Sequence, residues 1–542
     1  MTRQFRILLP LVLSLVGLAS CQSFLDEMPD NRAVIDTEEE IVSLLTSAYP
    51  EHNPAFIGEF MSDNAVMISE TNTYTDRFFD QVWHWEDVTE DDDDSPLRFW
   101  EESYRCIETA NLTLDKIDAL EAAGNGSKIL DECRGEALLC RSYNAFMLVN
   151  IFCKNFNQAT SSSDPGIPYP LQPDTELFPN LGRGTVAGVY QQIEKDLLQA
   201  LPLLGETHYN HPSYHFNHKA AYAFAARFYL YWEKWEKAEE YASLCLGSDP
   251  ASQLRDYEYL GGIQQGLAGA QVVPQSYVRE DEPANLLLIP TYSLIGVATS
   301  NYTYYKKYSY CVYLAEHEGL YADNVWGDAP FYETTYNLMS GGDRCDLSWH
   351  PRLPYLFQYV TDNSGYHRSI YPAFSTDECL LNRAEARVMM GRNQEAADDI
   401  NLWVGNYVQD PPTLTVDDIV EFYNSAAYSY DDTTGIASTI KKHLHPAFEI
   451  GPEGSVQEAM LQCVIGLRRM ETLHLGMRWF DVRRFGIVIP RIKLWMVGIN
   501  PFVGVFLEPE VSLDWLTVDD PRRTVQIPYA VSQGGLDKNP EK

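Results

Sequence analysis

Residues 217–246 read NHKAAYAFAARFYLYWEKWEKAEEYASLCL, and this stretch contains the clearest structural pattern in the chain. Alanine occupies five positions of its first half, 220, 221, 223, 225 and 226, and such small side chains let neighbouring helices approach closely. A new helical pattern begins at Trp235 and continues through Ala238 and Ala242. The stretch therefore predicts two α-helices joined by a tight turn.

The junction between these helices resembles the turn of a tetratricopeptide repeat. In that turn a small residue, an aromatic residue and an Ala three positions later allow two helices to pack tightly. A similar pattern recurs at residues 384–397, where Gly391 is followed by Ala396. Because Ala238 and Ala396 are 158 positions apart, the chain is not a tandem array with a period of about 34 residues. We expect separate helical hairpins with long insertions between them.

Further helices are expected on both sides of this stretch. Thr37 is a plausible N-cap because Glu38, Glu39 and Glu40 follow it at the positive end of the helix. Apolar residues at helical spacing predict four more helices, at residues 99–120, 129–153, 185–203 and 456–469. After the last of these, the Gly-rich and Pro-rich C-terminal region is expected to be coil.

Residues 246–375 have a different texture. Helical periodicity fades there, while Gly, Pro, Asn and Tyr become frequent. Long irregular stretches in a compact protein usually carry function. The fold is therefore predicted to be mostly α, with a scaffold of tetratricopeptide-like hairpins and a loop-rich ligand-binding side that contains short strands. The expected divisions are a signal peptide at 1–20, helical regions at 21–245 and 376–542, and the loop-rich insertion at 246–375.

The N-terminus has the pattern of an export signal. Arg3 and Arg6 precede an apolar run over residues 7–18, which is too short to cross a bilayer. The run ends in Leu-Ala-Ser-Cys, which matches the bacterial lipobox and predicts lipidation of Cys21. The alternative is an ordinary signal peptide with a Cys at that position by chance. Acylation at Cys21 would anchor the protein to a membrane without spanning it.

The chain is strongly acidic, with 40 basic and 77 acidic residues and a net charge of −37. Such a surface repels nucleic acid, so no nucleic-acid partner is expected. Nine Cys remain besides Cys21, and none forms a Cys-x-x-Cys pair. Buried free thiols are expected, with a Cys311–Cys345 disulfide as the alternative and no zinc site. No cofactor is expected.

Two aromatic clusters have the composition of a sugar-binding site. A sugar offers CH faces to flat rings and hydroxyl groups to polar side chains, and Tyr and Trp combine both properties. The predicted ligand-binding residues are Tyr74, Arg77, Trp83 and Trp85 in the first cluster, and Asn301, Tyr302, Tyr304, Tyr305, Tyr308 and Trp326 in the second. The alternative is that these rings are packing residues, because Trp83 and Trp85 alternate as residues of a strand do.

Two charged sets are interpreted as structural. Arg478, Asp481, Arg483 and Arg484 lie beside Trp479 and Phe480, and such charges more often join helices than perform chemistry. No catalytic residue and no metal ligand is therefore predicted. Residues 91–94 form an acidic run that is expected to be a solvated loop, and calcium binding there is the less favoured alternative.

Several segments together resemble the SusD/RagB family. These segments are, in order, Cys21 with Phe24-Leu25-Asp26 and Pro29; Tyr104-Arg105-Cys106-Ile107 through Asn111; Glu136-Ala137 through Tyr143; Asn382-Arg383-Ala384-Glu385-Ala386 with Gly391; Arg478-Trp479-Phe480-Asp481-Val482-Arg483-Arg484; and Ile527-Pro528 with Asn539-Pro540. Their order and spacing cover nearly the whole chain. Leu475, Cys140 and Ser142 depart from the family pattern, which concerns the subfamily more than the fold.

The resemblance implies an outer-membrane lipoprotein that faces the cell exterior. Proteins of this family bind oligosaccharides and cover a SusC-type TonB-dependent transporter, so both are expected partners. A non-catalytic role follows from the same resemblance. The alternatives are a peptide-binding member of the family and a glycoside hydrolase that uses two carboxylates. Neither Gly-x-Ser-x-Gly nor His-Glu-x-x-His is present.

Overall fold

The computed structural model describes residues 35–540 except for 69–76, 174–181, 264–268, 301–306, 334, 339–346, 363, 431–437 and 501–503. Helices dominate this part of the chain, as predicted. The α-helices are α2 (Glu38–Leu45), α3 (Ala55–Met61), α4 (Arg77–Trp83), α5 (Pro96–Ala122), α6 (Lys128–Phe152), α7 (Val186–Ala200), α8 (His218–Tyr231), α9 (Trp235–Leu246), α10 (Tyr257–Gly262), α11 (Gly269–Tyr277), α12 (Ile295–Thr299), α13 (Val312–Glu318), α14 (Thr376–Met389), α15 (Asn393–Tyr407), α16 (Val416–Ser425), α17 (Val456–Glu471), α18 (Arg478–Arg484) and α19 (Tyr529–Gln533).

The strands form three small sheets. The strands are β1 (Val66–Met67), β2 (Asn285–Tyr292), β3 (Tyr308–Ser309), β4 (Tyr336–Leu338), β5 (Leu347–Trp349), β6 (Leu356–Thr361), β7 (Ser364–Ser375), β8 (Ile489–Asn500) and β9 (Gly504–Leu516). Their orders are β3-β1-β8-β9, β2-β7-β6 and β4-β5. All of these strands except β1, β8 and β9 fall within residues 246–375, the region predicted to be loop-rich with short strands.

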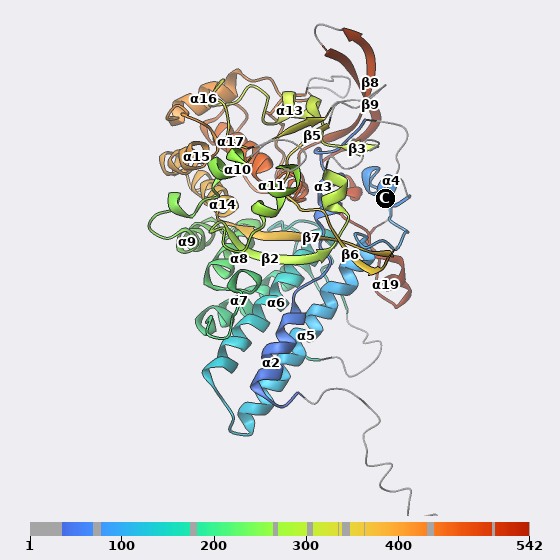
Figure 1. Cartoon of the computed structure of the whole chain (residues 1–542), viewed down its shortest axis with the longest axis vertical. Coiled ribbons are helices and arrows are strands. Elements are labelled where there is room, and N and C mark those ends of the chain that lie inside the picture. The colour runs from blue at the N-terminus through green and yellow to red at the C-terminus, as the bar shows by residue number, and fades with distance from the viewer. Residues whose placement is uncertain are drawn as a thin grey trace, which may run out of the picture.

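The predicted helical scaffold is confirmed. Helices α5, α6 and α7 pack in succession, α8 packs on α9, and α14 contacts α8, α9, α15 and α17. In Figure 1 α2 and α5–α7 occupy the lower half, the β2–β7 pair crosses the middle, and α14–α17 lie above it. The five Ala residues of α8 are buried at this helix junction. The Thr37 capping box is also present, with the Thr37 side chain accepting from the Glu40 backbone N–H.

The predicted C-terminal coil is wrong, because β8 and β9 form an antiparallel hairpin that projects from the top of the molecule (Figure 1). Pro490, Gly498, Pro501 and Pro509 gave this region the appearance of coil. Strand β9 lies at the edge of its sheet, and an edge strand tolerates a Pro because only one of its sides must pair.

A single large hydrophobic core joins the three regions expected from the sequence. It extends from Ile41 in α2 to Ile527 near the C-terminus and includes β2 and β7. Close packing brings distant backbones together where Gly58 of α3 faces Gly476. A Cβ at either position would overlap the backbone of the other segment, which explains the need for Gly at both.

Buried ion pairs hold the C-terminal helices against the rest of the protein. Arg478 donates to both carboxylate oxygens of Asp63, at 2.8 and 2.9 Å. Arg468 donates to Asp481 at 2.9 Å, and both Arg468 and Arg484 donate to Glu385 of α14. Burial alone would raise the pKa of Glu385, but Arg484 and Arg468 outweigh it and lower that pKa. The structural interpretation of the Arg478–Arg484 segment is therefore confirmed.

Seven Cys residues outside the alternative disulfide are free and buried, as expected: Cys106, Cys133, Cys140, Cys153, Cys245, Cys379 and Cys463. Cys311 is also a free buried thiol. Cys345, its alternative disulfide partner, lies outside the described residues. Within the acidic run, Asp94 is buried and accepts hydrogen bonds from the Ser293 hydroxyl at 2.5 Å and the Leu294 N–H at 2.6 Å. Asp94 therefore connects this loop to α12 rather than lying in solvent.

We predict that Glu385→Ala lowers the free energy of unfolding by about 3–5 kcal/mol, because it leaves two buried guanidinium groups without their carboxylate. Denaturant unfolding measures the effect. Glu101→Ala is the matched control, since the Arg98–Glu101 pair is about half exposed, and it should change stability by less than about 1 kcal/mol. Equal losses in the two variants would contradict the role given to Glu385.

Candidate functional site

Two residues of the predicted aromatic clusters, Trp83 and Tyr308, lie at one short strand pair. Strand β1 pairs antiparallel with β3, and Ile68 N–H donates to the Lys307 carbonyl at 2.8 Å directly beyond the pair. Residues 69–76 follow β1, and residues 301–306 precede β3. Ile68 and Lys307, which are more than 200 positions apart in the sequence, thus lie side by side at the β1–β3 edge.

Helix α4 is tied to this edge through Asp80. Its carboxylate accepts a hydrogen bond from the Lys307 ammonium at 2.7 Å and another from the Tyr308 hydroxyl at 2.6 Å. Burial would raise the pKa of Asp80, but the bonds from Lys307 and Tyr308 lower it below its usual value. The pKa of Tyr308 is raised, first by burial and then by its bond to Asp80. Asp80 therefore stays ionised at neutral pH and holds α4 against Lys307 and β3.

The rings of Trp83 and Trp85 form a buried layer beneath the edge. Both side chains are 0% exposed, and their indole N–H groups donate to the carbonyls of Ala65 and Met61, respectively. Trp83 stacks on Tyr308 with 4.6 Å between ring centroids and an angle of 20°. The Arg491 guanidinium lies 3.7 Å from the centroid of Trp85. These rings have no free face for a sugar, so in this structure they support the edge by packing.

The other predicted ligand-binding residues have varied positions. Trp326 is buried and packs against Trp403 of α15, apart from the β1–β3 layer. Arg77 begins α4, and its side chain is 69% exposed beside Glu90 at 3.6 Å. Of the predicted set, only Arg77 is therefore described with an accessible side chain. The remaining predicted residues, Tyr74, Asn301, Tyr302, Tyr304 and Tyr305, lie outside the described residues.

Sequence reasoning missed the residues that assemble this edge. Met67 of β1 pairs in parallel with Lys493 of β8, so the C-terminal hairpin completes the sheet. Arg491 donates to the carbonyls of Phe60, Met61 and Ser62 at the end of α3, at 3.0–3.2 Å. The alternation of apolar residues over 487–494 was the signal for a strand, but Pro490 obscured it.

The described residues contain neither a metal-binding cluster nor a membrane-spanning helix. No group of three or more His, Cys, Asp or Glu side chains in this part of the chain is placed to hold a metal ion. None of the helices in the described ranges combines the length and apolar character needed to cross a bilayer.

We predict that Trp83→Ala lowers the free energy of unfolding by about 3–5 kcal/mol, because it leaves a cavity under Tyr308 and removes the bond to Ala65. Thermal or denaturant unfolding measures this loss. Tyr359→Ala serves as the control, since the Tyr359 side chain is 71% exposed and its removal should have little effect. Unchanged stability of Trp83→Ala would show that the ring is not a packing residue.

Comparison with known proteins relates this geometry to one family. Residues 23–230 match a SusD-like family model, described as starch-binding and associating with the outer membrane. No curated protein sequence matches the chain.

Several crystal structures share the fold. A SusD superfamily protein from Bacteroides thetaiotaomicron is 16% identical, and the match covers 93% of this chain and 100% of that one with a TM-score of 0.61. A SusD-like carbohydrate-binding protein from Bacteroides vulgatus is 15% identical, with coverage of 92% and 97% and a TM-score of 0.62. A SusD superfamily protein from Parabacteroides distasonis is 15% identical, with coverage of 93% and 99% and a TM-score of 0.57. The chain therefore shares the fold of these structures over 93% of its length, and its residues 23–230 match the SusD-like family model.

Proposed function

We propose that this chain is a cell-surface lipoprotein that binds oligosaccharides and delivers them to a SusC-like TonB-dependent transporter of the outer membrane. The role is binding without catalysis. The observation that supports the proposal is the β1–β3 edge, where Ile68, just after β1, directly precedes residues 69–76 and Lys307, just before β3, directly follows residues 301–306. Oligosaccharide binding needs rings and polar side chains at one place, and both kinds of side chain occur in the two stretches of sequence that adjoin this strand pair.

The chemistry of the two anchored segments supports a sugar ligand. Residues 301–306 read NYTYYK, and residues 72–77 read NTYTDR. Both segments therefore combine Tyr rings with amide, hydroxyl and charged groups suited to sugar hydroxyls. The Bacteroides vulgatus relative, which is described as carbohydrate-binding, shares the fold over 92% of this chain. The family description as starch-binding points in the same direction.

The N-terminus supports attachment to the outer membrane. The lipobox at residues 18–21 would direct lipidation of Cys21, and several acyl chains anchor a protein far more firmly than one. The family model is described as associating with the outer membrane. Its match begins at residue 23, two positions after the proposed lipidated Cys.

We predict that Tyr305→Ala weakens oligosaccharide binding by about 1–3 kcal/mol, the scale of a lost aromatic contact. A glycan array on the chain without residues 1–21 identifies the ligand, and calorimetry measures the affinity of each variant. Tyr529→Ala is the control, because this 67% exposed ring lies on α19 and not at the β1–β3 edge. Unchanged affinity after replacement of all of Tyr74, Tyr302, Tyr304 and Tyr305 would place the site elsewhere. Binding of peptides in excess glycan, or turnover of a labelled oligosaccharide, would favour the alternative functions.

We also predict that Cys21→Ser releases the protein from the outer-membrane fraction, because the acylated side chain is the proposed anchor. Fractionation of cells and labelling with a palmitate analogue measure the effect. Ser20→Ala is the matched control, since it keeps a small residue before the Cys and should remain attached and labelled. Membrane attachment of Cys21→Ser would contradict lipid anchoring.

A further inference from the structure

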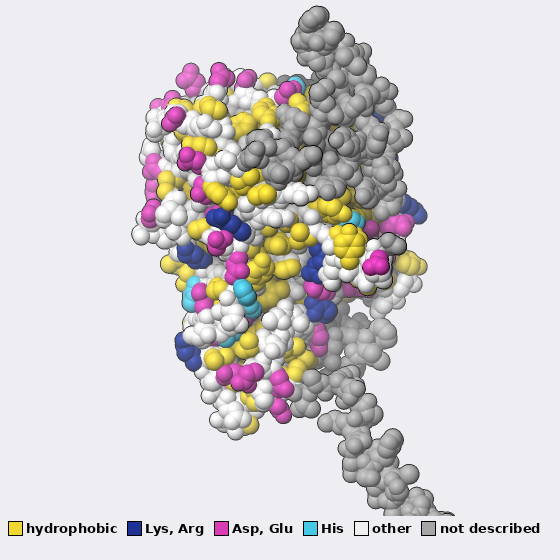
Figure 2. Space-filling model, in the orientation of Figure 1, with side chains coloured by type: hydrophobic (Ala, Val, Ile, Leu, Met, Phe, Trp, Pro, Cys, Tyr) yellow, Lys and Arg dark blue, Asp and Glu magenta, His cyan; other side chains and the backbone are white. Residues whose placement is uncertain are grey.

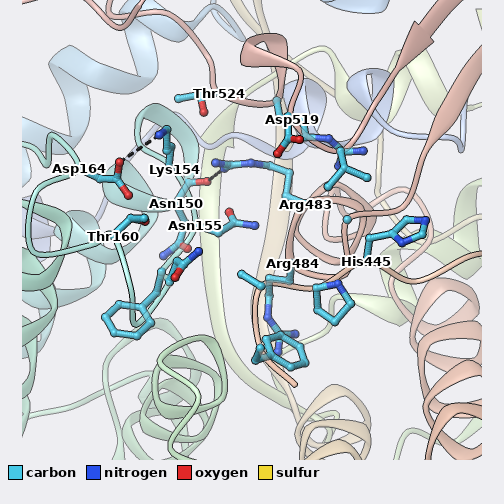
Figure 3. A pocket seen from close by; sticks show the side chains of 18 of the residues that line it. Asn150, Lys154, Asn155, Thr160, Asp164, His445, Arg483, Arg484, Asp519 and Thr524 are labelled. Atoms are coloured by element: carbon cyan, nitrogen blue, oxygen red, sulfur yellow. Dashed lines mark hydrogen bonds and ion pairs between the residues drawn. The ribbon is translucent and has the colours of Figure 1, made fainter. Parts of the chain in front are cut away.

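A polar cavity lies away from the β1–β3 edge, between α6, α18 and the α8–α9 turn. Its volume is about 680 Å³, within the range of small-molecule sites of about 300–1,000 Å³. In Figure 3 residues of the 150–164 segment form one wall, while His445 and Arg484 lie on the opposite side. Asp519 and Thr524 lie along a further edge of the same opening (Figure 3).

Two buried polar atoms of residues that line the cavity have no hydrogen-bond partner among the described residues. One is the donor Nε of Arg483 and the other is the acceptor Oδ2 of Asp164. Both residues are more than nine-tenths buried, with exposed fractions of 6% for Arg483 and 8% for Asp164. The other nitrogens of Arg483 donate to the carbonyls of Asn150 and Cys153, and Asp164 Oδ1 binds Lys154 at 3.0 Å. Unpaired buried polar atoms are rare in native proteins, and a bound molecule is a common reason for them.

Further polar groups in the cavity are also uncommitted. The Asn155 amide and the Glu233 carboxylate make no hydrogen bond with another described residue. Glu233 has a φ of 60°, in the left-handed region that a non-Gly residue rarely adopts, and such strain often marks a functional position. Burial raises the pKa of Glu233 to about 7, although the charge of Arg484 acts in the opposite direction. A ligand that forms hydrogen bonds with these groups would stabilise each of them.

The charges of the lining favour a neutral ligand. Four cationic side chains, Lys154, Arg483, Arg484 and Arg523, line the cavity, and four carboxylates, Asp164, Glu233, Asp519 and Asp520, balance them. The guanidinium of Arg523 is occupied by the carbonyls of Thr517, Val482, Ile487 and Leu516. An anionic ligand would meet the carboxylates and a net charge of −37.

We infer that this cavity is a second saccharide site, which takes a neutral, hydroxyl-rich sugar unit. A sugar hydroxyl both donates and accepts, so one ligand can satisfy the donor Arg483 Nε and the acceptors Asp164 and Glu233. The rings of Phe156 and Phe448, which line the cavity and are only partly buried, offer apolar surface to the CH groups of a sugar. The inference rests on the proposed function, and it adds a site separate from the β1–β3 edge.

The test is calorimetry with the neutral oligosaccharide that binds the wild-type protein most strongly on a glycan array. Arg483 and Asp164 are unsuitable targets because they hold the end of α6 and Lys154. The test variants are therefore Asn155→Ala and Glu233→Gln, and the matched controls are Gln158→Ala and Glu236→Gln. Both control residues are exposed and lie outside the lining of the cavity. Unfolding midpoints are measured for all four variants.

Support would be a loss of at least tenfold in affinity at one of two binding events, in both test variants and neither control, with unfolding midpoints unchanged. Wild-type binding by both test variants would overturn the second site, because water then suffices to pair the buried atoms. The second site would also be overturned if Tyr305→Ala abolished that binding event while Asn155→Ala and Glu233→Gln retained it. Binding of acidic saccharides alone would contradict a neutral ligand. A wild-type protein that binds no saccharide would instead overturn the proposed function.

Discussion

The pairing of buried guanidinium groups with buried carboxylates is the constraint on which the rest of this structure depends. A charge removed from water is costly unless an opposite charge and hydrogen bonds replace the solvent. Arg478 meets this condition by donating twice to Asp63, and Arg468 does so by donating to Asp481 and Glu385. Since each contact needs fixed geometry on both sides, these pairs determine how α14, α17 and α18 meet α3.

A second group of arginines uses helix ends in place of carboxylates. The last carbonyls of a helix lack backbone partners and carry partial negative charge. Arg483 fills this role at the end of α6, and Arg491 does so at the end of α3. Burial lowers the pKa of Arg483 to about 10, so the group remains charged at neutral pH. The carbonyls thus anchor the loops around the candidate site to the helical scaffold.

The helices could be predicted because their signals are local. Five Ala residues marked α8, and Thr37 with its following Glu residues marked the start of α2. Burial of individual rings depends on which distant segment covers them, and this information is not local. Trp83 and Trp85 were candidates for ligand contact because flat aromatic rings suit the CH faces of a sugar, whereas Arg491 and Tyr308 cover them in the fold. The β1–β3 pairing could not be predicted either, because strands of two residues are too short to show an alternation of apolar and polar side chains.

The contact between Asp63 and Arg478 joins positions 415 residues apart, which has a consequence for biosynthesis. The ribosome makes the N-terminus first, so α3 and Asp63 are synthesised long before α18. The buried side chains of Phe56 and Phe60 in α3 therefore lack this packing partner until most of the chain has been made. Contacts of such separation form late and leave apolar surface open to aggregation in the meantime. A product that ends before residue 478 therefore lacks the helix that packs on α3, and the apolar surface left open makes it a substrate for quality-control proteases.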